Sequence, residues 1–420
     1  MEKETRILQG YEYAGDVFAD LGIDAGKAVA EALLVPVSMH CWQGDDFHGL
    51  EGNCELTGGI AVTGSAPGCP RNADELRADM RKALTMIPGK TKLNLHASYA
   101  QTKGHKADRD AYTVGDFADW LAFAAENRLG LDFNPTFFSH PMMDGNFSLA
   151  SPNESKRRFW IEHGKRCREI GEAFGKAMKQ TCVVNYWMPD GFKDTPADTA
   201  LYRRRMAESL DEIFSAELDE KYVNESIESK LFGFGIESYT AASHEFSLGY
   251  AITRGKMYCL DCGHFHPTES IADKISAVLL YTKKLLLHTS RGVRWDSDHV
   301  VSLDDELLRI MNEIVAGDYL DRVCIAQDYF DASINRIACW TIAMRNTRKA
   351  LLMAMLYPHD RLKEAEENGD YTQRLALQQE CRSLPYSAVW DYLCLREGKL
   401  TGLECIDSIQ RYERDVLLSR

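Results

Sequence analysis

Eight short apolar runs, rich in β-branched residues and bounded by glycine, proline or polar residues, set the strongest limit on how this chain can fold. Runs of this kind predict buried strands. They cover residues 35–42, 93–99, 129–133, 182–187, 226–231, 257–261, 285–289 and 323–328. Segments with apolar residues three and four apart separate most of them, at 75–86, 114–126, 156–178 and 198–217, and this spacing predicts helices.

Strands that alternate with helices predict a parallel sheet. Eight such strands fit a closed (β/α)₈ barrel better than an open, doubly wound sheet, which remains the alternative. In a barrel, functional groups lie at the carboxyl ends of the strands. A polar residue stands towards the end of nearly every run, as such a site requires: His40, His96, Asp132, Asn185, Glu228, Asp261, His288 and Asp328.

The length of the chain allows more than a barrel. A barrel typically needs about 250 residues, and the surplus of this 420-residue chain collects at its two ends. We expect an N-terminal helical segment at 1–34, the barrel at 35–333 and a C-terminal helical extension at 334–420. Amphipathic helices in the extension need a partner for their apolar stripe, either the barrel wall or a neighbouring subunit. The glycine-rich stretch 44–70 predicts a long active-site loop.

Side chains that commonly bind metals are concentrated between residues 222 and 331. They are six carboxylates and two imidazoles: Glu228, Asp261, His264, His288, Asp296, Asp298, Asp328 and Asp331. Eight oxygen-rich candidates are too many for one tetrahedral zinc site and suit two octahedral-leaning divalent ions such as Mn²⁺, Mg²⁺ or Co²⁺.

Taken alone, most of these side chains could have a structural role that involves no metal. Asp261 with His264 could form a hydrogen-bonded turn, and His288 could be a core histidine. Asp296 with Asp298 could form a solvated turn. However, two acidic clusters at one barrel mouth would repel each other without cations, and this favours the metal interpretation.

Charge and cysteine usage narrow the possible partners and the compartment. The formal net charge is −14, which disfavours nucleic acid, because phosphate binding relies on Lys and Arg. The twelve cysteines are scattered, many in apolar runs, so we expect reduced thiols in a cytoplasmic protein rather than a disulfide framework. No run approaches the roughly 18 apolar residues of a membrane span, and the acidic N-terminus does not resemble a signal peptide.

Several longer strings are specific enough to indicate a family. In order over most of the chain they are VSMHCWQGDD, LNLHASY, GLDFNPTFFSHP, ESKLFGFGIESYT, DCGHFHPTE, ISAVLLY, VRWDSDHVV and DYFDASINRIACW. From about residue 33 into the C-terminal helices they closely resemble bacterial L-rhamnose isomerases. The resemblance implies an α/β fold, a (β/α)₈ TIM barrel that is xylose-isomerase-like, with additional N- and C-terminal helices. It also implies a homotetramer that interconverts L-rhamnose and L-rhamnulose, the first step of rhamnose catabolism.

The same resemblance implies how the metal ligands divide. A structural ion would be held by Glu228, Asp261, His288 and Asp328, and a catalytic ion by His264, Asp296 and Asp298. Mn²⁺ is the usual metal of the family, and Zn²⁺, Co²⁺ or Mg²⁺ are possible replacements. Asp331 lies outside this set and is expected to be a cap or turn carboxylate.

Two further residues are expected to act on the sugar. His96, with Asp328 as an orienting carboxylate, is the candidate for proton transfer when the sugar ring opens. Lys230 stands beside Glu228 at a strand end, which favours contact with a substrate oxygen, although a surface ion pair is the alternative. Trp42, Phe133 and Trp187 are expected to form an apolar pocket wall.

The metal-rich site predicts the reaction type. An aldose and its 2-ketose differ by one hydrogen moved between C2 and C1, and cations that chelate both oxygens make an organic cofactor unnecessary. The sequence offers no obvious free Glu as a base over C2, so we expect a metal-assisted C2 to C1 hydride shift rather than a cis-enediol route, as the resemblance also implies. The alternatives are an isomerase that prefers another aldose, a divalent-metal phosphodiester-cleaving barrel, and a non-catalytic sugar-binding barrel. The second would need a basic groove, and the third would have no use for two ions.

Overall fold

The fold is described from a computed structural model of the chain. The described residues are 2–42, 49–51, 64–231, 237–290 and 299–420. Within them, no helix is long and apolar enough to cross a membrane. The eleven cysteines in this part of the chain form no disulfide with one another.

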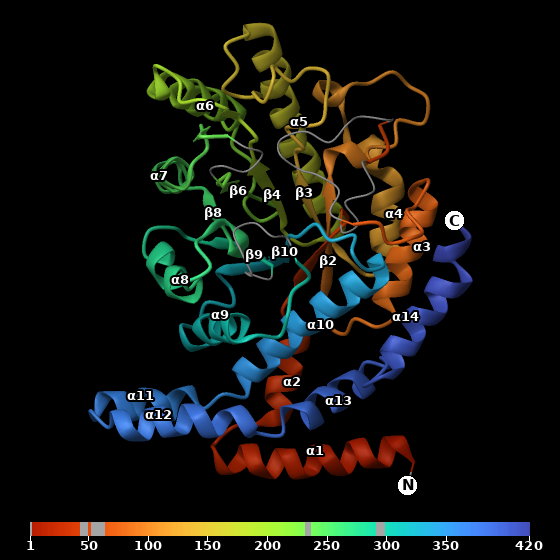
Figure 1. The fold of residues 1–420 in the computed structure, drawn as a ribbon, viewed down its shortest axis with the longest axis vertical. Coiled ribbons are helices and arrows are strands. Elements are labelled where there is room, and N and C mark those ends of the chain that lie inside the picture. The colour runs from red at the N-terminus through yellow and green to blue at the C-terminus, as the bar shows by residue number, and fades with distance from the viewer. Residues whose placement is uncertain (1, 43–48, 52–63, 232–236, 291–298) are drawn as a thin grey trace.

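Eight parallel strands close into a barrel at the centre of the molecule (Figure 1). They are β1 (Val37–His40), β2 (Thr91–His96), β3 (Gly130–Asn134), β4 (Cys182–Trp187), β6 (Val223–Glu228), β8 (Met257–Asp261), β9 (Leu285–Thr289) and β10 (Val323–Gln327). Pairing of β1 with β10 closes the ring. The barrel prediction is therefore confirmed, and the open sheet is excluded. A small antiparallel pair, β5 (Gly191–Phe192) with β7 (Tyr239–Thr240), lies outside the barrel sheet.

A layer of helices surrounds the barrel (Figure 1). It contains α3 (Ala73–Leu84), α4 (Ala118–Glu126), α5 (Glu154–Met178), α6 (Thr199–Ile213), α7 (His244–Arg254), α8 (Ala272–Leu279), α9 (Asp305–Ala316) and α10 (Arg336–Met355). Helix α10 packs against β1, α3 and α9. The helix that follows the last strand therefore belongs to the barrel layer, although its residues lie in the segment predicted as the C-terminal extension.

The remaining helices lie outside this layer. They are α1 (Lys3–Asp20), α2 (Ala25–Leu34), α11 (His359–Glu367), α12 (Tyr371–Glu380), α13 (Tyr386–Arg396) and α14 (Glu404–Asp415). Three of them, α1, α2 and α13, form a second apolar core with the end of α10. Helix α1 lies along α13, and this core contains Phe18, Val29, Leu352, Val389 and Trp390. The N-terminal helices are thus held by the C-terminal ones (Figure 1).

The barrel interior is built in layers, because alternate residues of each strand point inward. One layer is apolar and consists of Val183, Met257, Cys259, Leu286 and Ala326. Two residues further along these strands stand Asn185, Asp261, His288 and Asp328. The apolar layer thus forms the floor beneath a polar layer at the carboxyl ends of the strands.

Candidate metal centre and active site

Four of the predicted ligands meet at the carboxyl end of the barrel. One ligand atom from each of Glu228, Asp261, His288 and Asp328 lies within 4.8 Å of the others. His288 Nδ1 is at the centre, 3.5 Å from Glu228 Oε1, 3.5 Å from Asp261 Oδ2 and 3.2 Å from Asp328 Oδ2. The set comes from β6, β8, β9 and the residue after β10, so four separate strands assemble it.

The chemistry of this cluster fits a divalent cation. Three carboxylates converge in a buried place, where like charges repel strongly unless a cation neutralises them. His288 is fully buried, and among the described residues neither of its ring nitrogens makes a hydrogen bond of good geometry, although three carboxylates face Nδ1. Burial acts to lower the pKa of His288, but acidic neighbours led by Cys259 and Glu228 raise it well above its usual value. The site therefore attracts positive charge to the place where an ion would lie.

Local contacts fix the carboxylates in this arrangement. Asn185 Nδ2 on β4 donates to Glu228 Oε2, and the Gly263 backbone N–H donates to Asp261 Oδ1 at 2.6 Å. Trp42 Nε1 donates to Asp328 Oδ1 at 3.0 Å. Each carboxylate thus offers one oxygen to the protein and turns the other towards His288.

The predicted catalytic ligands are only partly described. His264, at the end of a single 3₁₀ turn after β8 (Cys262–His264), places Nδ1 3.9 Å from Glu228 Oε1. Asp296 and Asp298 lie outside the described residues. Asp331 accepts hydrogen bonds from the backbone N–H and the hydroxyl of Ser333, which matches the expected turn carboxylate.

His96 ends β2 and faces the same mouth. Its Nδ1 lies 2.7 Å from the hydroxyl oxygen of Thr136, so the orienting contact comes from Thr136 rather than directly from Asp328 as expected. Trp42 stands between the two, since its indole meets the His96 ring at 4.3 Å in an edge-to-face contact and donates to Asp328.

Lys230 is buried rather than at the surface. Its ammonium group forms an ion pair with Glu237 and donates to the carbonyl of Pro189 at 2.7 Å. It also lies 5.9 Å from the ring centre of Trp187. The surface ion pair considered as an alternative is therefore excluded, because both partners are almost fully buried.

The aromatic wall differs from the prediction at one position. Phe133 packs against Phe117 and Phe174, on the side of β3 that faces the helices, and it is fully buried there. The structure thus corrects the placement of Phe133 in the pocket wall, because residues on either side of an inward-facing strand position point outward. Phe138 takes this place, with edge-to-face contacts to His96 at 5.7 Å and to Trp187 at 5.5 Å.

Comparison with known proteins identifies the family. The family model described as L-rhamnose isomerase (RhaA) matches residues 5–420. The chain belongs to the L-rhamnose isomerase family. An L-rhamnose isomerase of Listeria innocua is 50% identical over 421 residues and covers 100% of both chains. An L-rhamnose isomerase of Mannheimia succiniciproducens is 52% identical over 99% of this chain and 100% of its own. A solved L-ribulose 3-epimerase aligns with a TM-score of 0.45 and 12% identity over 76% of this chain and 95% of its own, too weak a likeness to support an argument.

The strings that predicted the L-rhamnose isomerase family also carry three of the four residues of the described metal cluster, all except His288. Glu228 stands in ESKLFGFGIESYT, Asp261 and His264 in DCGHFHPTE, and Asp328 in DYFDASINRIACW.

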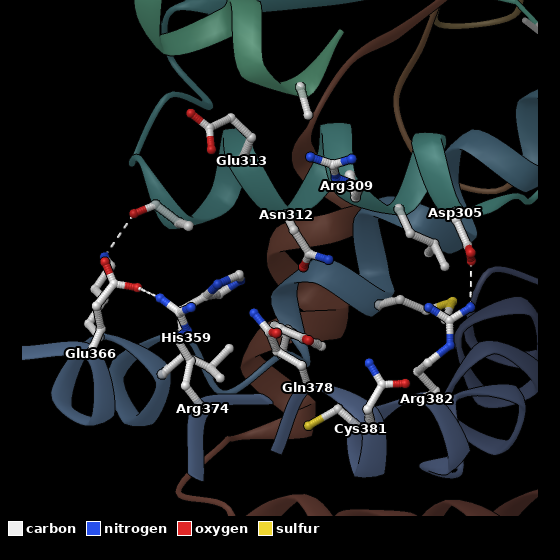
Figure 2. A pocket seen from close by; sticks show the side chains of 18 of the residues that line it. Asp305, Arg309, Asn312, Glu313, His359, Glu366, Arg374, Gln378, Cys381 and Arg382 are labelled. Carbon is white, nitrogen blue, oxygen red and sulfur yellow. Dashed lines mark hydrogen bonds and ion pairs between the residues drawn. The ribbon is translucent and has the colours of Figure 1, made fainter. Parts of the chain in front are cut away.

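A cleft of about 760 Å³ lies between α9 and the α11–α12 pair (Figure 2). None of the predicted site residues that the structure describes lines it, and several of its charged groups pair with one another, as Arg382 does with Asp305 and Arg374 with Glu366. It is therefore separate from the barrel mouth.

Proposed function

We propose that this protein is a divalent-metal-dependent isomerase that interconverts L-rhamnose and L-rhamnulose and so begins rhamnose catabolism. The observation that carries the proposal is the buried cluster of Glu228, Asp261, His288 and Asp328 at the barrel mouth, in a chain of the L-rhamnose isomerase family. The names of the relatives give the substrate, and the cluster gives a reason for a metal.

We assign the two ion sites by residue. Glu228, Asp261, His288 and Asp328 would hold a structural ion, whereas His264, Asp296 and Asp298 would hold a catalytic one. We propose Mn²⁺, with Zn²⁺, Co²⁺ or Mg²⁺ as replacements. When bound, such ions supply Lewis-acid chemistry, since they polarise a carbonyl and stabilise negative charge on neighbouring sugar oxygens.

The side chains around the site favour a C2 to C1 hydride shift. Glu228, Asp261 and Asp328 each already accept a hydrogen bond from the protein and face His288, which leaves them poorly placed to take a proton from C2. Trp42 and Trp187 supply apolar surface that would keep water from the transferred hydrogen.

His96 and Lys230 are proposed to act on the sugar oxygens. His96 would move the proton of the anomeric hydroxyl when the ring opens. Lys230 is held by Glu237 and Pro189, so its positive charge has a fixed position from which it would orient a substrate oxygen.

One assay tests the proposal against its rivals. Purified protein is freed of metal with a chelator, loaded with Mn²⁺ or Co²⁺, and supplied with L-rhamnose, other 6-deoxyhexoses, common aldoses and a phosphodiester. We expect ketose from L-rhamnose, loss of activity on chelation and recovery with either ion. Full activity in protein shown by elemental analysis to lack metal would refute the metal-dependent reaction. Preference for another aldose would correct the substrate.

We further propose a cytoplasmic homotetramer. An apolar groove of about 1140 Å³ runs between α10, α13 and α14, and Ile334, Ile342 and Ile406 are each more than a third exposed along it. Exposed apolar side chains gathered along one groove favour contact with another protein surface, and we assign this groove to a second copy of the chain. Light scattering should give four chains per particle, and Ile342→Glu should reduce that number. A wild-type monomer would refute the assignment.

A further inference from the structure

We propose that Thr136 is a positioning residue that fixes the tautomer of His96, so that Nδ1 carries the proton and Nε2 accepts one from the sugar. The inference rests on the proposed function, because it concerns the ring-opening step assigned to His96. The observations that support it lie in the loop after β3, which the metal cluster does not include.

The hydroxyl of Thr136 makes two contacts but has only one hydrogen. Its oxygen lies 2.7 Å from His96 Nδ1 and 3.3 Å from the carbonyl oxygen of Asn134. A carbonyl can only accept, so the hydroxyl hydrogen satisfies both contacts only when it points to Asn134. The hydroxyl lone pair then accepts the Nδ1–H of His96. The opposite arrangement would place two oxygens against each other with no hydrogen between them.

The backbone of this loop is held in an unfavourable conformation that brings the hydroxyl to His96. Thr136 has a φ of +36°, which a β-branched residue rarely adopts, and Ser139 has a φ of +53°. Such backbone persists only where surrounding contacts impose it, and it is concentrated at functional sites.

Arg109 supplies those contacts. Its guanidinium group donates to the carbonyl oxygens of Thr136 at 2.5 Å, Phe138 at 2.7 Å and Ser139 at 3.2 Å. The remaining N–H groups bind the carboxylate of Glu51 at 2.6 to 3.1 Å, so all five donors of this buried side chain are used. Arg109 therefore clamps the loop that carries the hydroxyl.

Aromatic side chains prevent the His96 ring from turning over and exchanging its two nitrogens. Trp42 meets the ring at 4.3 Å, Phe138 at 5.7 Å and Tyr99 at 6.3 Å. Burial lowers the pKa of His96 to about 3, so the ring is neutral at pH 7 and only one nitrogen carries a proton. Which nitrogen that is depends on Thr136.

The proton balance of ring opening fits this tautomer. Nε2 takes the proton of the anomeric hydroxyl O1, the electrons of that O–H bond form the C1=O1 double bond, and the C1–O5 bond breaks. The imidazolium then returns the same proton from Nε2 to O5, which becomes a hydroxyl. His96 ends as it began, and no other reactant is needed. Throughout the cycle Nδ1–H remains bonded to Thr136.

The test compares two substitutions at one position. Thr136→Val keeps the β-branched shape but removes the hydroxyl, whereas Thr136→Ser keeps the hydroxyl. Loss of a well-oriented general base costs about 10²- to 10⁴-fold, and we expect loss of orientation alone to lower kcat about 10- to 100-fold. KM should change less than about twofold, and Thr136→Ser should recover most of the kcat. Thr282→Val, at a buried threonine after α8 that bonds to Val278, serves as the matched control and should leave kcat unchanged.

A second measurement reads the tautomer of His96 in the wild-type protein itself. Nitrogen-15 spectra of histidine-labelled wild-type protein, loaded with diamagnetic Mg²⁺, should show His96 with a protonated Nδ1 and a bare Nε2, and His96→Asn would assign the signals. A protonated Nε2 would overturn the inference. So would a Thr136→Val protein with the kcat of wild type, or Val and Ser variants that lose kcat equally. If wild-type protein forms no ketose, the proposed function fails instead, whereas the spectrum still reports the tautomer.

Discussion

Substitution of Glu228 by Gln should change the stability of the metal-free and metal-loaded protein in opposite directions. Gln has the same shape, and its amide oxygen can still accept the hydrogen bond that Asn185 gives to Oε2. The substitution replaces the negative charge of Glu228, whose Oε1 lies 3.5 Å from His288 Nδ1, with a neutral amide. The change therefore removes an anionic ligand while leaving the surrounding packing in place.

The stabilisation lost with the ion and the repulsion relieved in the metal-free protein have similar magnitudes. An ion present at a hundred times its dissociation constant, and bound only by the folded state, stabilises that state by about 2.7 kcal/mol. A ligand loss that weakens binding a hundredfold removes most of this. In the metal-free protein, the Glu228 carboxylate lies within 4.8 Å of those of Asp261 and Asp328, and each pair repels by at least about 3.5 kcal/mol at an effective dielectric constant of about 20. A proton on His288, whose Nδ1 is 3.5 Å from Glu228 Oε1, attracts the same carboxylate by about 4.7 kcal/mol on this scale. The two repulsions together outweigh this attraction, so we expect the metal-free variant to gain on the order of 1 to 2 kcal/mol.

Thermal unfolding with and without Mn²⁺ measures both effects, and elemental analysis gives the bound metal. Glu225→Gln is the matched control on the same strand: Glu225 pairs with Arg168 and Lys256 away from the cluster, so its loss should destabilise both forms alike. If Mn²⁺ raises the midpoint of Glu228→Gln as much as that of wild type, or if the metal-free variant is the less stable one, the assignment of Glu228 to a structural ion is wrong.

Three further predictions follow from the site. Asp296→Asn should abolish most turnover and keep the stabilisation by Mn²⁺, and loss of that stabilisation would contradict the division of ligands. Isomerisation in D₂O should leave almost no deuterium at the ketose C1 by NMR, whereas substantial incorporation in the first turnovers would indicate a side-chain base. Burial raises the pKa of Asp190 from 3.8 to about 6, so the folded protein binds the proton more tightly and loses up to about 3 kcal/mol of stability as pH rises from about 4 to 6. Asp190→Asn should lack this loss, and parallel pH profiles of the melting midpoint for variant and wild type would contradict the shift.

The strands could be predicted from the sequence because burial on both faces makes them almost continuously apolar. Two of the predicted runs, 93–99 and 226–231, begin two or three residues later than the observed strands β2 and β6, for physical reasons. The run 93–99 continues past β2 into the 3₁₀ turn Ala97–Tyr99, which is equally buried, so hydrophobicity alone does not mark the end of the strand. Strand β6 begins at Val223 with polar residues, among them Glu225, whose buried partner Arg168 lies far away in the sequence. The division into segments 1–34, 35–333 and 334–420 stays a prediction.

The alternation of side chains along a strand also predicts which residues can line the pocket. Asp132 is a polar residue near the end of its strand, and its side chain contacts Lys92 inside the barrel. Its neighbour Phe133 must then point to the helices, and the sequence already contained that consequence. The position of Phe138 could not be obtained in this way, because it depends on a loop whose path is set by the positive φ of Thr136 and by Arg109.

The position of His264 affects the results expected for the two metal-site variants, Asp296→Asn and Glu228→Gln. Its Nδ1 lies 3.9 Å from the same Glu228 oxygen that faces His288, so Glu228 stands between the two proposed ligand sets. A charge shared in this way would couple the two proposed ions, since the carboxylate proposed to hold the structural ion would also attract the catalytic one. The variants should therefore differ asymmetrically. Asp296→Asn should affect turnover alone, whereas Glu228→Gln should lower both turnover and metal-dependent stability. A Glu228→Gln protein with full turnover would show that the two sites are independent.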